Sequence, residues 1–214
     1  MAETYMTFFL RPTEESPDAF GKRMREWAVE LAANSQATAV IAFADDGDVG
    51  APPEATFTRP THAGALLTTG IPSHDLPAGD ALYGVRRRVI KARSRGRDGA
   101  RSEGFTVLCP SVRIAHVDHE QFDAHWRDVH SKVHVASSPG TCHYEQLVID
   151  EWLTPGAPLW DGVGLLSFAS ASDYTERLFG PGGEAAIMAD VQNFVDLSRG
   201  ETLPASEFVY RDDA

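Results

Sequence analysis

Apolar and polar positions alternate along the chain with two periods, and these periods predict its secondary structure. Short runs rich in aromatic and β-branched residues predict eight strands, at residues 4–11, 37–44, 62–69, 84–94, 105–113, 142–151, 162–168 and 203–210. Apolar residues spaced by three or four predict helices, at residues 18–33, 118–135, 171–179 and 184–197, with a weaker helix or turn at 71–82. The order strand, helix, strand, strand, helix, strand therefore occurs twice.

The apolar positions of the two halves also align with one another. At an offset of 102 residues Phe20 aligns with Phe122 and Leu31 with Val133, and farther along the offset becomes 99. Insertions in loops would produce such a drift, so the pattern indicates an internal duplication. Each half has the β-α-β-β-α-β order of a ferredoxin-like unit. We predict an α+β fold with one unit at residues 1–95, a polar linker at 96–104 and a second unit at 105–214.

The helix predicted at residues 118–135 carries an unusual number of histidines. Asp118 is a suitable N-cap, and Gln121 can complete a capping box. One face of the helix is apolar and is formed by Phe122, Trp126, Val129 and Val133. At about 100° per residue, four polar residues follow one flank of that face, namely His119, Asp123, His130 and His134. This arrangement predicts the rim of a pocket.

The histidine flank belongs to the second half alone. At the offset of 102 residues, His130 aligns with Ala28 and Asp123 aligns with Gly21. The repeated apolar positions serve the fold, whereas His130 and Asp123 are free to serve a site.

Composition and charge limit the class of protein. The 214 residues are 43% hydrophobic and 23% charged, as in ordinary globular proteins. Residues 1–104 contain 13 basic and 14 acidic side chains, whereas residues 105–214 contain 6 and 17. Because nucleic acids and anionic membranes need a basic surface, the acidic second half disfavours both as partners.

Other features of the chain favour a cytoplasmic protein. The N-terminus lacks the basic and apolar regions of a signal peptide, and no run approaches the roughly 18 apolar residues that span a membrane. Cys109 and Cys142 lie outside any C-x-x-C pattern, which favours simple thiols in a reducing compartment.

The motif F-D-A-H-W-R-D-V-H, from Phe122 to His130, resembles the F-x-x-[YH]-W-x-x-x-H helix of the EthD family, within the dimeric α/β-barrel superfamily. The resemblance continues in three later motifs: Tyr144-Glu145-Gln146, W-D-G-V-G-L-L-S-F from Trp160, and Asp190, Phe194 and Asp196. It covers about residues 105–210, and the first half is a degenerate copy without the motif residues.

The resemblance implies a barrel built from two ferredoxin-like sheets, which the duplication supplies within one chain. Relatives include dehydratase-like enzymes of polyketide pathways, and oxygenases and cyclases that need no metal or organic cofactor. By this resemblance we predict a cofactor-independent enzyme, lyase-like or cyclase-like, that acts on a small hydrophobic or aromatic, polyketide-like molecule. The reaction would be a proton transfer, as in dehydration, elimination or cyclisation.

Three residues are the predicted catalytic groups. His130 matches the family's histidine and, with an ordinary pKa near 6.5, can act as general acid or base. Asp123 would orient it, and Tyr144 would donate a hydrogen bond to a substrate oxygen. The predicted substrate-binding residues are Phe122, Trp126, His119, Trp160 and Phe168. Core packing is an equally good interpretation of the aromatic residues, and a surface ion pair is the commoner role for a residue such as Asp123.

Several alternatives stay open. His130 and His134 have the spacing of two zinc ligands, although we expect no metal. The chain could be a non-enzymatic ligand carrier or accessory protein of a degradation pathway, or a cofactorless or haem-using monooxygenase of the same superfamily. The basic run at residues 86–93 is typical of an exposed edge strand, or of a surface that docks onto the acidic half. The barrel could be complete in one chain or could associate as a homodimer.

Overall fold

Eight antiparallel strands form a closed barrel in the computed structural model, which describes residues 3–51 and 61–213. The first half contributes four strands: β1 (Thr4–Phe9), β2 (Ala39–Ala44), β3 (Gly64–Thr69) and β4 (Ala81–Lys91). The second half contributes β5 (Phe105–Ser111), β6 (Thr141–Trp152), β7 (Gly162–Phe168) and β8 (Leu203–Asp212). All eight predicted strands are confirmed.

The order of strands around the barrel repeats. It runs β4-β1-β3-β2 and continues as β8-β5-β7-β6, so the same order occurs in both halves. The two sets join where β2 pairs with β8 and where β4 pairs with β6. The predicted α+β fold, with two ferredoxin-like units in one barrel, is confirmed. The exact limits of the units and their origin by duplication stay predictions.

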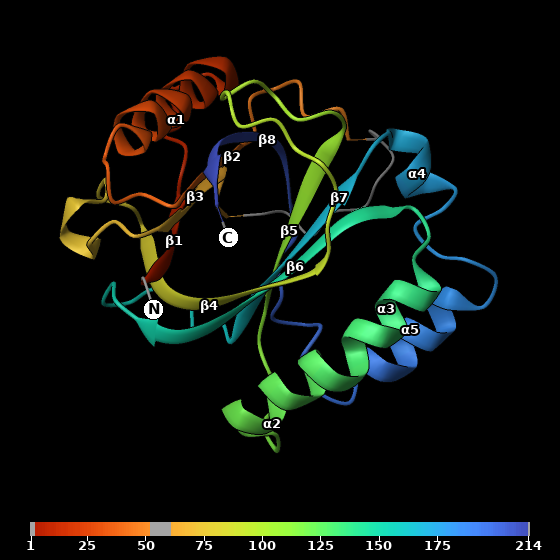
Figure 1. Cartoon of the computed structure of the whole chain (residues 1–214). Helices are drawn as coiled ribbons and strands as arrows, with labels where there is room; N and C mark the ends of the chain where they lie inside the picture. The colour runs from red at the N-terminus through yellow and green to blue at the C-terminus, as the bar shows by residue number, and fades with distance from the viewer. Residues whose placement is uncertain (1–2, 52–60, 214) are drawn as a thin grey trace.

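One helix covers the first half of the barrel, and a layer of shorter helices covers the second half on the opposite side (Figure 1). The single helix, α1 (Pro17–Ala32), begins after Ser16, whose side chain accepts the backbone N–H of Ala19. The predicted weak helix at residues 71–82 contains only a short 3-10 turn, η1 (Ser73–Asp75). Two prolines in that stretch remove backbone donors and so prevent a regular helix.

In the second half, three consecutive segments form one continuous helical rod. They are α2 (His119–His125), the π-helical turn η2 (Trp126–His130) and α3 (Ser131–Ser137). Asp118 and Gln121 form the predicted capping box at its start. Two further helices, α4 (Ala171–Thr175) and α5 (Gly183–Val191), follow β7, and α5 packs against the rod. None of the described helices is long and apolar enough to cross a membrane.

The interior of the barrel is a packed apolar core over most of its length. Side chains alternate between the two faces of each strand, so Leu147 and Ile149 of β6 point inward. Toward one end, Phe8, Tyr83 and Trp160 contact one another at ring-centroid distances of 5.0 to 6.1 Å. The barrel therefore has no channel along this part of its axis.

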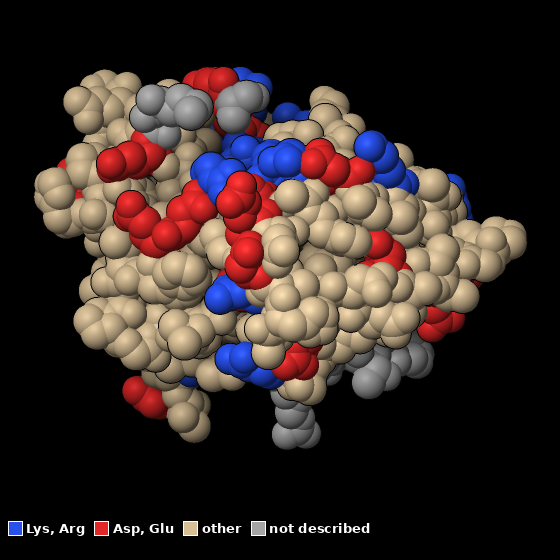
Figure 2. All heavy atoms as spheres, turned by 90° about the horizontal axis from the view of Figure 1, so that it is seen from below, with Lys and Arg blue, Asp and Glu red and all other residues tan. Residues whose placement is uncertain are grey.

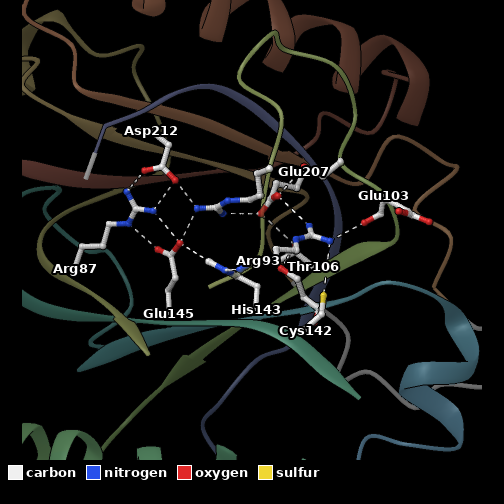
Figure 3. Close-up of polar contacts among 12 residues, drawn as sticks. Arg87, Arg93, Glu103, Thr106, Cys142, His143, Glu145, Glu207 and Asp212 are labelled. Atoms are coloured by element: carbon white, nitrogen blue, oxygen red, sulfur yellow. Dashed lines mark hydrogen bonds and ion pairs between the residues drawn. The ribbon is translucent and has the colours of Figure 1, made fainter. Parts of the chain in front are cut away.

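Buried ion pairs close the other end of the interior (Figure 3). Glu145 of β6 and Glu207 of β8 have side chains that are 0% and 1% exposed. Arg87 of β4 binds Glu145 at 2.7 Å and Asp212 at 2.6 Å. Arg95, which follows β4, binds Glu145 at 2.9 Å and Glu207 at 3.1 Å. These pairs compensate for the several kcal/mol that each buried ion would otherwise lose by leaving water.

The basic run of β4 joins the two halves of the barrel. Because β4 pairs with both β1 and β6, the interpretation of this run as an exposed edge strand is wrong. Arg86 and Arg88 point outward to Asp123 of the second half, and Arg86 also pairs with Asp150. Docking of the basic run onto the acidic half is confirmed. Basic and acidic side chains accordingly lie next to one another on the face seen in Figure 2.

The predicted linker at residues 96–104 runs beside β8. The backbone N–H groups of Gly99 and Ser102 donate to the carbonyls of Val209 and Glu207, at 3.0 and 2.8 Å. The segment that connects the halves is therefore hydrogen-bonded to the barrel.

Candidate functional site

A cavity of about 270 Å³ lies between the helix layer of the second half and the outer face of β5, β6 and β7. Most of its lining is apolar, with Val107, Leu166, Phe168, Ile187, Val191 and Phe194 among the contributing residues. Its polar lining includes Cys109, Ser111, His130, His134, Tyr144 and Thr202. A mostly apolar cavity with a few polar groups is the usual form of a small-molecule site.

The first half packs differently at the equivalent place. There α1 lies directly on the sheet, and Phe20, Met24 and Leu31 join Val40 and Leu66 in one buried apolar cluster. The apolar side chains of α1 therefore fill the space between helix and sheet in the first half. In the second half the rod leaves a cavity between itself and the sheet. The two halves share a fold and differ in the site.

The π turn places the histidines of the rod over the cavity. Buried residues follow one another at a spacing of four: Phe122, Trp126, His130 and His134. In a regular α-helix each step of four residues overshoots a full turn by about 40°. The extra residue within the π turn reduces this drift, so all four side chains face the sheet. Val129, which we predicted on the apolar face, is 43% exposed, and that prediction is wrong.

His130 is held by a carboxylate from α5. Its Nδ1 lies 2.7 Å from Oδ2 of Asp190, and both side chains are about nine-tenths buried. Burial lowers the pKa of His130, and the hydrogen bond and charge of Asp190 oppose this without cancelling it. The neutral ring donates its Nδ1–H to the carboxylate, which leaves Nε2 unprotonated for a group in the cavity.

The same carboxylate binds a second histidine. Nε2 of His125 lies 2.8 Å from Oδ1 of Asp190. The ring of Phe194 packs against both imidazoles, with centroid distances of 4.7 Å to His125 and 5.3 Å to His130. Asp190 is thus fixed between two rings.

His134 lies one turn beyond His130 and is a neutral group in the cavity wall. Burial lowers its pKa to about 3, and the positive charge of Lys91 acts in the same direction. Its Nε2 lies 3.3 Å from Oγ1 of Thr141, and its ring packs at 4.5 Å on the ring of Tyr144. His130 and His134 therefore have different hydrogen-bond partners. Within the part of the chain that the structure describes, no three His, Cys, Asp or Glu side chains are grouped to hold a metal ion.

Tyr144 forms the floor of the cavity through a buried network. Its hydroxyl accepts hydrogen bonds from Nε1 of Trp126 at 2.9 Å and from Nε2 of Gln146 at 3.0 Å. Burial raises the pKa of Tyr144, so the phenol stays protonated. Trp126 can lie on the sheet because Gly162 has no side chain: a Cβ there would meet the indole at 2.3 Å. These contacts fix the position of the phenol.

The rod, the strand that follows it and α5 fall within one stretch that matches a known family. Residues 115–198 match the EthD domain. The residues that contact His130 or Asp190, namely His125, His134 and Phe194, lie in this stretch. No curated protein matches the sequence.

Solved structures resemble the chain in fold. An anthrone oxidase-like protein superposes with a TM-score of 0.59 at 12% identity, covering 100% of this chain and 95% of that one. A candidate monooxygenase from Lactobacillus acidophilus has a TM-score of 0.55 at 11% identity, covering 100% and 96%. A candidate monooxygenase from Fusobacterium nucleatum has a TM-score of 0.51 at 10% identity, covering 98% and 92%. The whole chain thus shares the α/β-barrel fold of these structures, and the match to the EthD domain covers residues 115–198 of its second half.

The structure brings most of the predicted site residues of the second half together. Five of the predicted residues line the cavity, namely Phe122, Trp126, His130, Tyr144 and Phe168. Their roles in catalysis or binding stay predictions, because a position in the wall does not show what a side chain does.

Three predicted residues lie elsewhere. Asp123 is directed away from His130 because Arg86 and Arg88 of β4 bind its carboxylate. His119 lies between Asp150 and Asp161, at 3.4 Å from each, outside the cavity. Trp160 is directed into the barrel, where it packs on Phe8 and Tyr83, because it precedes β7 on the inward side.

Asp190 is the site residue whose role the sequence analysis missed. It lies 60 residues after His130, and only the folding of α5 onto the rod brings the two together. The one available signal was its place among the motif residues of the EthD resemblance. Cys109 was interpreted only as a simple thiol, and it lines the cavity with a pKa that burial raises to about 12.

Proposed function

We propose that this protein is an enzyme that transfers a proton on a small hydrophobic, aromatic or polyketide-like molecule bound in the cavity of its EthD domain. His130 is the general base, and Asp190 holds it. The observation that carries the proposal is the 2.7 Å contact between His130 Nδ1 and Asp190 Oδ2 at the wall of an apolar cavity. The reaction class is dehydration, elimination or cyclisation, without a metal or organic cofactor.

The size of the cavity supports a substrate of fused rings. An apolar cavity of about 150 Å³ accommodates one benzene ring, and the present one is about 270 Å³. About two fused rings fit this space. The surrounding aromatic side chains Phe122, Trp126 and Phe168 offer ring faces and edges for stacking.

The chemistry follows from the protonation states. With Nδ1–H donated to Asp190, His130 presents an unprotonated Nε2 that can take a proton from an acidic C–H or O–H bond of the substrate. Asp190 then stabilises the imidazolium that forms. In a dehydration the same proton passes from Nε2 to the hydroxyl that leaves as water. In a cyclisation it passes from Nε2 to the alkoxide that forms when the carbanion adds to a carbonyl group. The phenol of Tyr144, held by Trp126 and Gln146, faces this region as a neutral group.

A second candidate function is oxygenation, and the names of the structural neighbours favour it. The first step would be the same proton abstraction by His130. The resulting carbanion would then be oxidised by O₂, so that a ring CH₂ becomes C=O and the second oxygen atom leaves in water. Measured consumption of O₂ separates this outcome from a lyase or cyclase reaction.

The experiment is turnover of a panel of fused-ring phenols and ketones with acidic C–H bonds, followed by mass spectrometry and an oxygen electrode. Because positioned acid–base catalysis contributes about 10²- to 10⁴-fold, His130→Ala should lower turnover by that factor, and a cooperative thermal melt should show that the variant is still folded. His119→Ala, outside the cavity, is the matched control and should retain activity. If the wild-type protein and His130→Ala bind the panel equally and neither turns it over, the protein is a ligand carrier, and the proposal is wrong.

A further inference from the structure

His125 lies outside the cavity, and its contact with Asp190 links the cavity to solvent. Each oxygen of Asp190 accepts one histidine: Oδ2 faces His130 Nδ1 at 2.7 Å, and Oδ1 faces His125 Nε2 at 2.8 Å. The side chains are 9% exposed for His130, 10% for Asp190 and 27% for His125. Exposure thus increases along the row from the cavity outward.

The contacts determine where the protons lie. An ionised carboxylate only accepts hydrogen bonds, so both rings must donate an N–H to it. His130 therefore carries its proton on Nδ1, and neutral His125 carries its proton on Nε2. Phe194 packs on both rings and limits their rotation. The remaining nitrogen of His125 is directed away from Asp190, on the more exposed side of the row.

We propose that His125 is a positioning residue for His130. It fixes the carboxylate of Asp190, and a proton on His125 makes that carboxylate less able to stabilise a protonated His130. The relevance to catalysis rests on the proposed function. The effect of His125 on the protonation of His130 does not rest on the proposed function, because it is a property of the protein without substrate.

Electrostatics gives the direction of the effect. A carboxylate between two imidazoles favours a positive charge on either ring, and a charge already present on one ring disfavours a second. Protonation of His125 thus makes the protonation of His130 harder. The charge of His125 acts in this direction on the pKa of His130.

Other ionisable groups near the pair stay constant over the relevant pH range. The pKa of His134 is lowered to about 3 by burial, and burial raises the pKa of Tyr144 and of Cys109. Lys91 donates from Nζ to the carbonyl of Thr141, and its charge lowers the pKa of His134. On the next turn of the rod, Arg127 and Asp128 pair with each other at the surface. His134, Tyr144, Cys109, Arg127 and Asp128 keep their charge states between pH 5 and 8, so the pair itself dominates the titration.

The experiment is a pH titration of the imidazole ¹⁵N signals by NMR in the wild-type protein, His125→Gln and His125→Phe. The wild-type His130 signal should titrate together with that of His125, as one coupled pair. Glutamine can keep the N–H donor to Asp190 but cannot become charged, so His130 should titrate in a single step, at a pH higher by about one unit. Phenylalanine keeps the packing on Phe194 and removes the donor, which should raise the pKa of His130 at least as far.

His119→Gln is the control, because His119 does not contact Asp190, and it should leave the His130 titration unchanged. Identical His130 titrations in the wild-type protein and both His125 variants would overturn the inference. So would an equal shift in the control. The assay needs no substrate, so a shift seen in a protein that turns over nothing supports the inference and counts only against the proposed function. In an active protein, the pH profile of turnover should move with the NMR titration.

Discussion

Replacement of Arg95 by methionine tests whether the ionic end of the barrel stabilises the fold. Arg95 is 6% exposed and contacts three carboxylates, those of Glu145, Glu207 and Asp212. Methionine retains much of the volume of the side chain and removes its charge. We expect a lower free energy of unfolding at neutral pH.

The expected loss of unfolding free energy depends on which ion pairs remain after Arg95 is replaced. Removing one member of a buried ion pair costs about 3–5 kcal/mol, because the other member stays buried without compensation. In the variant, Arg87 still binds Glu145 and Asp212, and Arg93 still binds Glu207. We therefore expect about 3 kcal/mol, the lower end of the range.

The pH dependence gives the prediction its sign. Burial raises the pKa of Glu145, but the hydrogen bonds from Arg87 and His143 and the charge of Arg95 outweigh burial and hold that pKa below its usual range. A carboxyl with a lowered folded pKa contributes stability above its unfolded pKa, about 4.3, and loses it as the pH falls. Without Arg95 the folded pKa of Glu145 rises. The deficit of the variant should be largest near pH 7 and shrink as the pH falls below the folded pKa that Glu145 has in the variant.

The assay is urea unfolding at pH 7, 5 and 4, followed by circular dichroism. Arg97→Met is the matched control: Arg97 pairs with Asp213, and both side chains are 58% exposed. An exposed pair of this kind contributes 1 kcal/mol at most. Equal destabilisation by both variants, or a deficit of Arg95→Met that is independent of pH, would refute the reasoning.

Two further predictions concern the cavity wall. Gly162→Ala places a Cβ against Trp126 and should cost about 1–3 kcal/mol of stability in urea unfolding. Gly164→Ala is the control and should be nearly neutral, because its Cβ would have its nearest neighbour at 3.7 Å. Equal effects of the two variants would show that the indole can move. Because burial lowers the pKa of His134 to about 3, the unfolded chain binds a proton below about pH 6.5 that the folded chain does not, so stability should fall by about 2 kcal/mol from pH 7.5 to pH 5. His134→Gln should remove most of this loss, and an unchanged pH dependence would contradict the assignment.

The regular elements could be predicted from the sequence, because local patterns determine them. The eight strands follow from apolar and β-branched runs, and the cap of the rod follows from Asp118 and Gln121 alone. The two ferredoxin-like units were predicted from the alignment of the halves at offsets of 102 and 99 residues, and the barrel was predicted from the EthD resemblance. The strands and the helix cap depend on neighbours in the chain.

The site depended on contacts that no local pattern contains. A helix of constant pitch places Val129 on the apolar face, but the π turn exposes it and buries His130 and His134. Asp123 was predicted to orient His130 because the two share a flank of the same helix. The arginines of β4 bind Asp123 instead, and Asp190 arrives from a different helix. The partner of a buried charge is decided by tertiary packing, which the spacing of residues in one helix does not reveal.

The closed barrel within one chain has a consequence for how this protein can change. In a symmetric homodimer every substitution is made twice, so a residue that improves one cavity must also be tolerated in the other. Here α1 and the rod are encoded separately, and each can acquire substitutions that would be harmful in its counterpart. The first half can be selected for stability alone, with α1 packed directly on the sheet, while the second half contains the cavity and the buried carboxylate of Asp190. Because the two halves can change independently, one barrel can evolve a single, asymmetric site.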